Sequence, residues 1–414
     1  MKKVLFLSFI AVIVIALTVY LQSCKRENVE NIYSPEKDAM FAPLDMANEV
    51  AENINKSEVV LNTTEKSLLK SAKYIGKRKI KNSRTVSDRK KVPYFYIFNY
   101  DSGGFSIVPA DQRLEPTIAY GESGSFNLDS LPYGVVRWLN ENAQLINHLR
   151  ATNAKQSATV NYLWSNAQCG PPSPLKSANY APCPPLPCQS STTSVTVGPL
   201  LTTKWDQGYG YNNYCPVLSG GPNGHTYTGC STTAVAQVMY YWKYPSTYNW
   251  GAMVTYSSDA TAKLMGDIFP GTIDSYDTGG SSCSNDYNMR HTFLNFGYQS
   301  ASLAGYVNGI TENGGYNYQT VVSNLKNRWP VILGAYNDYV NILGLYSYPT
   351  GSGHIWVCDG YTSTSVVDCE SGMSYSTLYF HMNWGWSGLH NDWYAFNAWP
   401  YYSFFPDMIY NIHP

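Results

Sequence analysis

The sequence predicts an α+β protein with two folded parts and a proline-rich connection between them. In residues 38–152, a helical pattern, a group of strand patterns and a second helical pattern follow one another. Residues 165–199 are rich in Pro, Ser and Cys, and no packed element survives that proline density. Beyond residue 200 a helix precedes several strand-like runs, which is the order typical of an α+β domain. With 414 residues, the chain can bury a sizeable core.

The N-terminus predicts export. Two lysines precede an apolar run over residues 4–21, which is long enough to cross a membrane as a helix. The run ends in L-Q-S-C, and this ending resembles a bacterial lipoprotein signal in which Cys24 is lipidated and becomes the new N-terminus. We therefore expect a lipoprotein-type signal peptide over residues 1–24. An ordinary signal peptide or an uncleaved anchor is the alternative, and each of these exports the chain.

The first folded part is expected to be one α+β domain over residues 25–164. Residues 38–54 place apolar side chains at helical spacing. Residues 93–126 alternate aromatic and β-branched residues around D-S-G-G, which predicts a hairpin and further strands. A second helix is expected over residues 135–152. The linker that follows, residues 165–199, should be accessible to proteolysis.

The second folded part is expected over residues 200–414. Its best helical pattern covers residues 232–243, and shorter helical patterns lie near residues 285–297 and 319–328. Apolar runs rich in aromatic and β-branched residues predict four strands. These runs are residues 329–338, 354–361, 377–386 and 392–399.

Charge is unevenly distributed along the chain. Residues 25–165 carry 19 Lys and Arg against 16 Asp and Glu, whereas residues 198–414 carry 6 against 13. Eleven of the basic residues lie between positions 66 and 91. Such a run is most often a solvated face, although it can bind nucleic acid or an anionic membrane. Here it could also face the acidic part of its own chain. We expect no nucleic-acid partner.

Nine cysteines are present, at positions 24, 169, 183, 188, 215, 230, 283, 358 and 369. Their spacing does not resemble a zinc ligand set, so we expect neither a metal nor another cofactor. Export permits disulfides. With Cys24 assigned to lipid, eight cysteines remain. An even set could pair completely in disulfides, so the number alone does not show whether one of them is a free thiol.

Cys230 is the first candidate catalytic residue. It stands in T-G-C-S-T-T-A-V-A-Q-V-M-Y-Y-W, directly before a helical pattern. A sulfur at that position lies beside the N–H groups and the positive dipole end of a helix, which lowers a thiol pKa. A buried small hydrophobe is the alternative. A nucleophilic thiolate also needs a proton-transfer partner, normally histidine.

His354 is the best partner among seven histidines. It stands in G-S-G-H-I-W-V-C-D-G-Y, where glycines allow close backbone approach and an apolar strand would hold the ring. In H-M-N-W-G-W-S-G, Asn383 can accept the Nδ1–H of the imidazole and Trp384 can shield that bond from water. Gln207, 23 residues before Cys230, could hold a tetrahedral oxyanion together with the backbone N–H of Cys230.

The order Gln, Cys, His, Asn is that of papain-type peptidases, and the surrounding residues resemble the streptopain family of cysteine peptidases. The resemblance lies in KWDQGYGYNNYCP, TGCSTTAVAQVMYYWKYP, SGHIWVCDGY and NWGW. FYIFNYDSGGFSIVPADQRLEPTIAY resembles the inhibitory propeptide of that family. The resemblance implies a zymogen: a papain-like catalytic domain over residues 200–414, preceded by an α+β inhibitory propeptide domain.

The resemblance also implies roles for individual residues. Cys230 would be the nucleophile and His354 the general base and acid, with Gln207 at the oxyanion hole and Asn383 and Trp384 beside the histidine. Substrate-binding backbone would lie at Gly353 and Ser282. Two departures are visible: STTAV follows Cys230 where VATAM is more usual, and GLHNDWY replaces an expected D-G plus aromatics. The second departure affects the rim of the cleft.

The implied partners are protein or peptide substrates, with a bulky apolar residue two positions before the cut bond, and the chain's own propeptide. Lipidated Cys24 would attach the chain to the outer membrane or cell surface, from which the mature enzyme could be released. Two other functions remain open. Transglutaminase-like acyl transfer would use an aspartate such as Asp368 in place of Asn383. A non-catalytic surface lipoprotein would have all its cysteines oxidised and would bind protein or glycan through its aromatic residues.

Overall fold

The computed structural model describes nine segments of the chain: residues 33–53, 78–168, 189–282, 286–307, 310–312, 317–336, 353–368, 372–396 and 407–414. The chain divides into two units, residues 1–39 and 40–414. The first contains the short 3-10 helix η1 (Pro35–Lys37), and all other elements belong to the second. The expected signal peptide with Cys24 lies outside the described residues. Within these segments, no helix has the length and apolar character needed to span a membrane.

Residues 40–168 form an α+β N-terminal domain. Its elements are α2 (Leu44–Asn53), β1 (Ile80–Ser87), β2 (Pro93–Tyr100), β3 (Phe105–Pro109), β4 (Ala119–Gly121), α3 (Tyr133–Ala151) and α4 (Ala158–Gln168). The helices expected over residues 38–54 and 135–152 are confirmed, as is the hairpin at D-S-G-G. Gly103 and Gly104 have φ values of 82° and 85° in that turn, a conformation that glycine adopts without strain.

The basic run is exposed where the structure describes it. Residues 81–85 of β1 are exposed, and β1 pairs only with β2 among the described strands. Lys79 pairs with Asp101 at 2.8 Å and Arg84 with Asp129 at 3.6 Å, so these ion pairs stay within the N-terminal domain. The described part of the run is therefore a solvated face, because most side chains of β1 are exposed and these two ion pairs stay within their own domain.

Residues 189–414 form the C-terminal domain. Its helices are η4 (Pro222–Gly224), α5 (Cys230–Trp242), η5 (Trp250–Ala252), α6 (Asp259–Thr272), α7 (Asp286–Asn295) and α8 (Tyr318–Lys326). Its strands are β5 (Gln189–Val197), β6 (Ser275–Asp277), β7 (Gly280–Ser282), β8 (Ser300–Val307), β9 (Ile310–Glu312), β10 (Val331–Tyr336), β11 (Gly353–Asp368), β12 (Ser374–Asn383), β13 (Asp392–Ala395) and β14 (Asp407–His413). The expected helices and strands are all found, and β11 is longer than expected.

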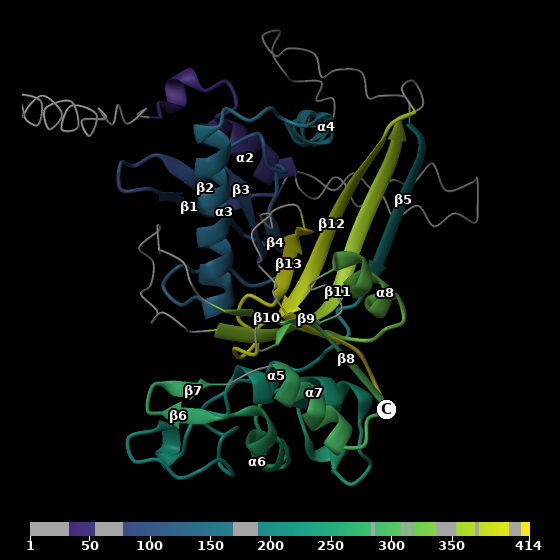
Figure 1. Ribbon diagram of the computed structural model, residues 1–414. Coiled ribbons are helices and arrows are strands. Elements are labelled where there is room, and N and C mark those ends of the chain that lie inside the picture. Colours follow the sequence, from purple (N-terminus) through teal and green to yellow (C-terminus); the bar gives the residue numbers. More distant parts are fainter. Residues whose placement is uncertain are drawn as a thin grey trace, which may run out of the picture. The chain divides into compact units, whose positions relative to one another are not determined.

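One sheet runs through both domains. The strand order is β1-β2-β3-β4-β13-β12-β11-β10-β14-β8-β9, with β5 added beside β11. The junction is the antiparallel pair β4–β13, in which Tyr120 lies opposite Trp393 and Ala119 opposite Tyr394. In Figure 1, β11 and β12 are the long antiparallel pair, with β5 along the outer half of β11.

The expected linker over residues 165–199 differs from the structure at both ends. Helix α4 continues to Gln168, and residues 189–197 form strand β5. The prolines of the segment lie at positions 171–187 and 199, so Q-S-S-T-T-S-V-T-V contains none. Its β-branched residues suit a strand. Hydroxyl pairs Thr196–Thr362 (2.8 Å) and Ser194–Thr364 (3.1 Å) join it to β11.

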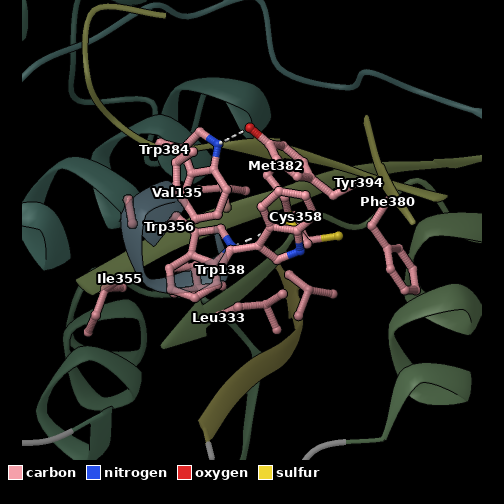
Figure 2. Close-up of a cluster of buried hydrophobic side chains, with 14 of the residues drawn as sticks. Val135, Trp138, Leu333, Ile355, Trp356, Cys358, Phe380, Met382, Trp384 and Tyr394 are labelled. Carbon is pink, nitrogen blue, oxygen red and sulfur yellow. Dashed lines mark hydrogen bonds between the residues drawn. The ribbon is translucent and has the colours of Figure 1, made fainter. Parts of the chain in front are cut away.

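The main hydrophobic core contains residues of both domains. Val135 and Trp138 of α3 are buried together with Trp356 on β11 and Tyr394 on β13 (Figure 2). The rings of Trp138 and Tyr394 meet edge to face, with centroids 5.1 Å apart. Helix α3 therefore packs directly on the strands that carry the candidate catalytic residues.

Candidate active site

Cys230 is the first residue of α5, as the sequence predicts. The preceding Gly229 has a φ of 82°, and a Cβ there would lie 2.6 Å from the Ile273 side chain, so only glycine fits. Among the described residues, no side chain caps this helix start. The half-buried sulfur therefore lies at the N-terminus of α5, where backbone N–H groups and the helix dipole stabilise a thiolate.

The hydroxyl residues after Cys230 hold the helix start in place. Ser231 donates to the carbonyl of Thr272 at 3.2 Å, and the hydroxyls of Thr232 and Thr272 are 2.7 Å apart. Thr233 donates back to the carbonyl of Gly229 at 3.0 Å. S-T-T thus fixes α5 against the end of α6, which explains three small hydroxyl residues in a buried position.

The thiol of Cys230 differs from the two other described thiols. Cys215, Cys230 and Cys358 are all thiols rather than disulfides. Burial raises the pKa of Cys215 to about 12 and that of Cys358 well above its ordinary value, so both are unreactive. This finding disagrees with a lipoprotein whose cysteines are all oxidised.

His354 lies on β11 with its ring deeply buried. It is 3% exposed and stacks against Trp356 and Trp384, with ring centroids 5.9 and 6.3 Å away. Its Nε2 is 3.0 Å from the carbonyl oxygen of Trp384. A carbonyl only accepts, so Nε2 carries the proton and Nδ1 is the basic nitrogen. Burial lowers the pKa of His354 to about 4, although the hydrogen bond to Trp384 acts in the opposite direction.

Asn383 and Trp384 lie close to His354 in the fold, and it is the backbone carbonyl of Trp384 that accepts the hydrogen bond from the imidazole. The Asn383 side chain donates to the carbonyl of Thr203 at 3.0 Å and accepts from the N–H of Gly385 at 3.2 Å. Although the sequence predicts a bond from Nδ1 to the Asn383 side chain, Nε2 of His354 donates to the Trp384 carbonyl in the full-length chain. Asn383 instead shapes the turn that presents this carbonyl.

The loop of Gln207 reaches the segment before Cys230. The carbonyl of Gln207 accepts from the N–H of Thr228 at 2.9 Å, two residues before the candidate nucleophile. On its other side, Ser387 donates its N–H to the carbonyl of Trp205 at 3.1 Å. Residues 205–208 thus lie between the start of α5 and the N-W-G-W-S turn. The oxyanion role of Gln207 stays a prediction.

The start of α3 covers the imidazole. A Cβ on Gly134 would lie 2.3 Å from the ring of Trp384 and 3.1 Å from Cδ2 of His354. The backbone of Gly134 is therefore in direct contact with both rings, and it contributes to the burial that lowers the pKa of His354. A role for Gly134 could not be predicted from the sequence, because a glycine near a helix start has no signal of its own.

A second contact ties the N-terminal domain to the same turn. His390 lies 4.5 Å from Phe126, centroid to centroid, and its Nε2 is 3.3 Å from the carbonyl of Ser130. The carbonyl of His390 accepts from the Trp384 indole N–H at 2.9 Å. Burial lowers the pKa of His390 to about 4. This residue also had no distinguishing sequence signal.

The expected substrate-binding positions lie at the ends of strands. Gly353 is the first residue of β11, exposed and opposite Tyr336. Ser282 is the last residue of β7, and its side chain lies outside the described set. Its neighbour Ser281 donates to the carbonyl of Tyr227 at 2.6 Å, which places the end of β7 beside the irregular segment that leads to Cys230.

Asp368 is the last residue of β11, whereas His354 is the second. The two residues are 14 positions apart on the continuous β11. At about 3.3 Å per residue, they are separated by roughly 46 Å. Asp368 therefore does not orient His354, and the transglutaminase-like alternative loses its proposed acid.

Comparison with known proteins matches both domains. A model of the Peptidase C10 family matches residues 205–247 and 246–394, and a model of the Spi protease inhibitor matches residues 45–146. The thiol protease/hemagglutinin PrtT of Porphyromonas gingivalis is 25% identical over 341 residues, which cover 72% of this chain and 33% of PrtT. Streptopain of Streptococcus pyogenes serotype M1 is 23% identical over 354 residues, which cover 73% of this chain and 74% of streptopain.

A solved structure shares the fold. Prointerpain A of Prevotella intermedia, in a mutant fragment, superposes with a TM-score of 0.52 at 21% identity, covering 80% of this chain and 99% of that one. The fold and the site define a papain-like cysteine endopeptidase that carries its own inhibitory domain. The chain belongs to the streptopain family.

Proposed function

We propose that this chain is an exported, surface-anchored cysteine endopeptidase, made as a zymogen, that cleaves proteins through Cys230 and His354. The observation that carries the proposal is the position of Cys230 at the start of α5, combined with His354 held beneath α3 with Nδ1 as its basic nitrogen. Lipidation of Cys24 would provide the anchor, and cleavage between α4 and β5 would release the mature enzyme.

In the proposed reaction, the Cys230 thiolate attacks the carbonyl carbon of the scissile peptide bond. The N–H of Cys230 and the Gln207 amide donate to the oxyanion that forms. Protonated His354 gives its proton to the leaving amine, and the thioester is then hydrolysed by water that His354 activates. Asn383 and Trp384 support the imidazole through the turn that they share. Backbone at Gly353 and Ser282 would bind the substrate, with a bulky apolar residue two positions before the cut.

The N-terminal domain would inhibit by acting on the imidazole. Contact with Gly134 and the surrounding rings keeps His354 out of water, and burial lowers its pKa. The positive end of the α3 dipole further disfavours an imidazolium there. A neutral imidazole cannot form the ion pair that activates Cys230. Removal of α3 would return His354 to water, raise its pKa and allow that pair to form.

Purified full-length wild type and Cys230→Ala test the proposal. Wild type should shorten to a fragment of about 225 residues, the length from β5 to the C-terminus, while Cys230→Ala stays full length. Iodoacetamide should label matured wild type at Cys230, and His354→Ala should lose this rapid labelling. Identical maturation of wild type and Cys230→Ala would rule out self-processing. Absence of peptide hydrolysis by matured enzyme that has not been alkylated, in a preparation whose Cys230 reacts fully with iodoacetamide, would rule out the endopeptidase.

A further inference from the structure

The carboxylate of Asp206 connects two loops of the site. Its Oδ1 accepts from the backbone N–H of Gln207 at 2.5 Å and from that of Gly208 at 3.3 Å. Its Oδ2 accepts from the hydroxyl of Ser387. The side chain is half-buried, so its bonds are partly shielded from water. Both oxygens are therefore engaged in holding backbone or turn residues.

The turn at Ser387 also holds the imidazole. Ser387 has a φ of 52°, in the left-handed region, and its N–H donates to the carbonyl of Trp205 at 3.1 Å. Three residues earlier in the same turn, the carbonyl of Trp384 accepts from Nε2 of His354. The turn thus contacts the general base at one end and the loop of Gln207 at the other.

Gln207 is fixed on both sides of its peptide backbone. Asp206 accepts its N–H, and Thr228 donates to its carbonyl. With both peptide planes fixed, the direction of the Cα–Cβ bond is fixed as well. An oxyanion donor stabilises the transition state only when it is already oriented before charge develops. The loop therefore has the rigidity that an oxyanion glutamine requires.

We propose that Asp206 and Ser387 form a positioning pair that holds the Gln207 amide at the oxyanion hole. The inference rests on the proposed peptidase function and on the role given there to Gln207. Asp206 acts through Gln207 rather than on the substrate. The simplest alternative is that the pair only stabilises the loop, and the two roles predict different kinetics.

Variants of the full-length chain separate these roles. Each zymogen is processed by an added serine peptidase that is then inactivated, and active enzyme is counted by titrating Cys230. We expect Asp206→Ala to lower kcat on the order of 10-fold to 100-fold, less than loss of a whole oxyanion donor, with KM changed less than about threefold. Ser387→Gly, which tolerates the positive φ, should lower kcat less. Asp206→Asn should retain most activity, because its amide oxygen still accepts the backbone N–H groups.

Asn317→Ala is the matched control, because Asn317 also accepts a backbone N–H, from Gln319 at 2.8 Å, at the start of α8. It should lower Tm and leave kcat unchanged. The rate of Cys230 alkylation should be the same in Asp206→Ala and wild type, since the pair does not act on the thiolate. A kcat loss that follows the alkylation rate, or a lower Tm with unchanged kcat, would overturn the proposal.

A double-mutant cycle completes the test. Gln207→Ala should lower kcat by about 100-fold to 1,000-fold, and adding Asp206→Ala should lower it no further. If the loss of kcat in the double variant equals the product of the two single losses, Asp206 does not act through Gln207. That result would contradict this inference and would not contradict the proposed peptidase function. Wild-type kcat in Gln207→Ala would remove the oxyanion role itself and this inference with it.

Discussion

At the scale of single residues, Asp359 shows how the segment that follows β5 is attached to the sheet. Its Oδ1 is 2.6 Å from Nδ1 of His381, its Oδ2 accepts from the N–H of Leu201 at 2.9 Å, and its carbonyl accepts from the N–H of Leu200. Burial acts to lower the pKa of His381, but the Asp359 carboxylate outweighs it and the pKa is raised. A charged pair is therefore buried between β11 and β12.

Replacing Asp359 should destabilise the fold strongly. Asp359→Ala leaves a charged imidazole buried without its carboxylate, and breaking such pairs costs about 3–5 kcal/mol. We expect a lower midpoint of urea unfolding. Because the pKa of His381 is raised in the folded state, the pair contributes most below the ordinary His pKa of about 6.5 and loses its contribution as pH rises through the folded value.

Asp359→Ala should therefore lose less stability, relative to wild type, at alkaline pH than at pH 6. Ser365→Ala, on the partly exposed half of β11, is the control and should unfold like wild type. A loss for Asp359→Ala below about 1 kcal/mol at pH 6 would contradict a stabilising buried pair.

The sequence predicted the candidate residues better than their contacts. Cys230 could be placed at a helix start because a helical pattern follows a glycine directly. The bond from His354 to the Trp384 carbonyl could not be predicted, because the direction of a carbonyl depends on the turn geometry that Asn383 and Gly385 set together. Asp359 and His381 gave no signal, since each alone is an ordinary polar residue in a strand.

At the scale of elements, the start of α3 is the contact through which we propose that the N-terminal domain inhibits. Gly134 leaves no room for a side chain against Trp384 and His354. Gly134→Ala should therefore push α3 away, at a cost of about 1–3 kcal/mol from overpacking. The docked state would then be disfavoured by roughly 5-fold to 150-fold. We expect faster alkylation of Cys230 in the full-length chain and faster maturation.

Gln144→Ala is the matched control, because Gln144 lies on the same helix with an exposed side chain. It should mature at the wild-type rate. If Gly134→Ala matured no faster than Gln144→Ala, the contact at Gly134 would not be what restrains the enzyme.

Helices and strands with a clear hydrophobic periodicity were predicted from the sequence, and elements without one were missed. Helix α6 was missed because Gly266 and Pro270 interrupt its sequence, yet Ser258 caps it and Gly266 lets its backbone approach Tyr214 closely. Strand β5 was hidden by the prolines on either side of it. The pairing of β4 with β13 joins residues more than 270 positions apart, and a single sequence holds no information about such register.

At the scale of the whole molecule, we expect docking of the N-terminal domain on the C-terminal domain to depend on pH through His390. This residue is buried under Phe126 and Ser130 of the N-terminal domain, and its docked pKa is lowered to about 4. Docking therefore favours the neutral ring. Between about pH 6.5 and pH 4, His390 is protonated in the undocked form and neutral in the docked form. For this one group, the equilibrium constant for docking therefore falls about tenfold for each pH unit.

His390→Asn isolates the effect, since Asn does not titrate and tolerates the φ of 58°. Full-length chains are alkylated at Cys230 over pH 4.5–8, and wild type is compared with the variant at each pH. The alkylation rate of wild type divided by that of His390→Asn should be constant above about pH 7 and should rise below pH 6.5. Contributions from His354, and from Asp392, whose pKa burial raises to about 8, cancel in this ratio. A ratio independent of pH would exclude His390 as a proton-linked contact.

Because one sheet runs through both domains, cleavage of the chain should not by itself produce an active enzyme. Severing the segment between α4 and β5 breaks one peptide bond but leaves the backbone hydrogen bonds of β4–β13 and the packing of α3 untouched. We therefore expect the cut product to be a two-chain complex in which the N-terminal domain still covers His354. A lag should therefore separate the appearance of nicked protein from the first turnover, with a duration set by dissociation of the detached domain, and dilution should prevent its return.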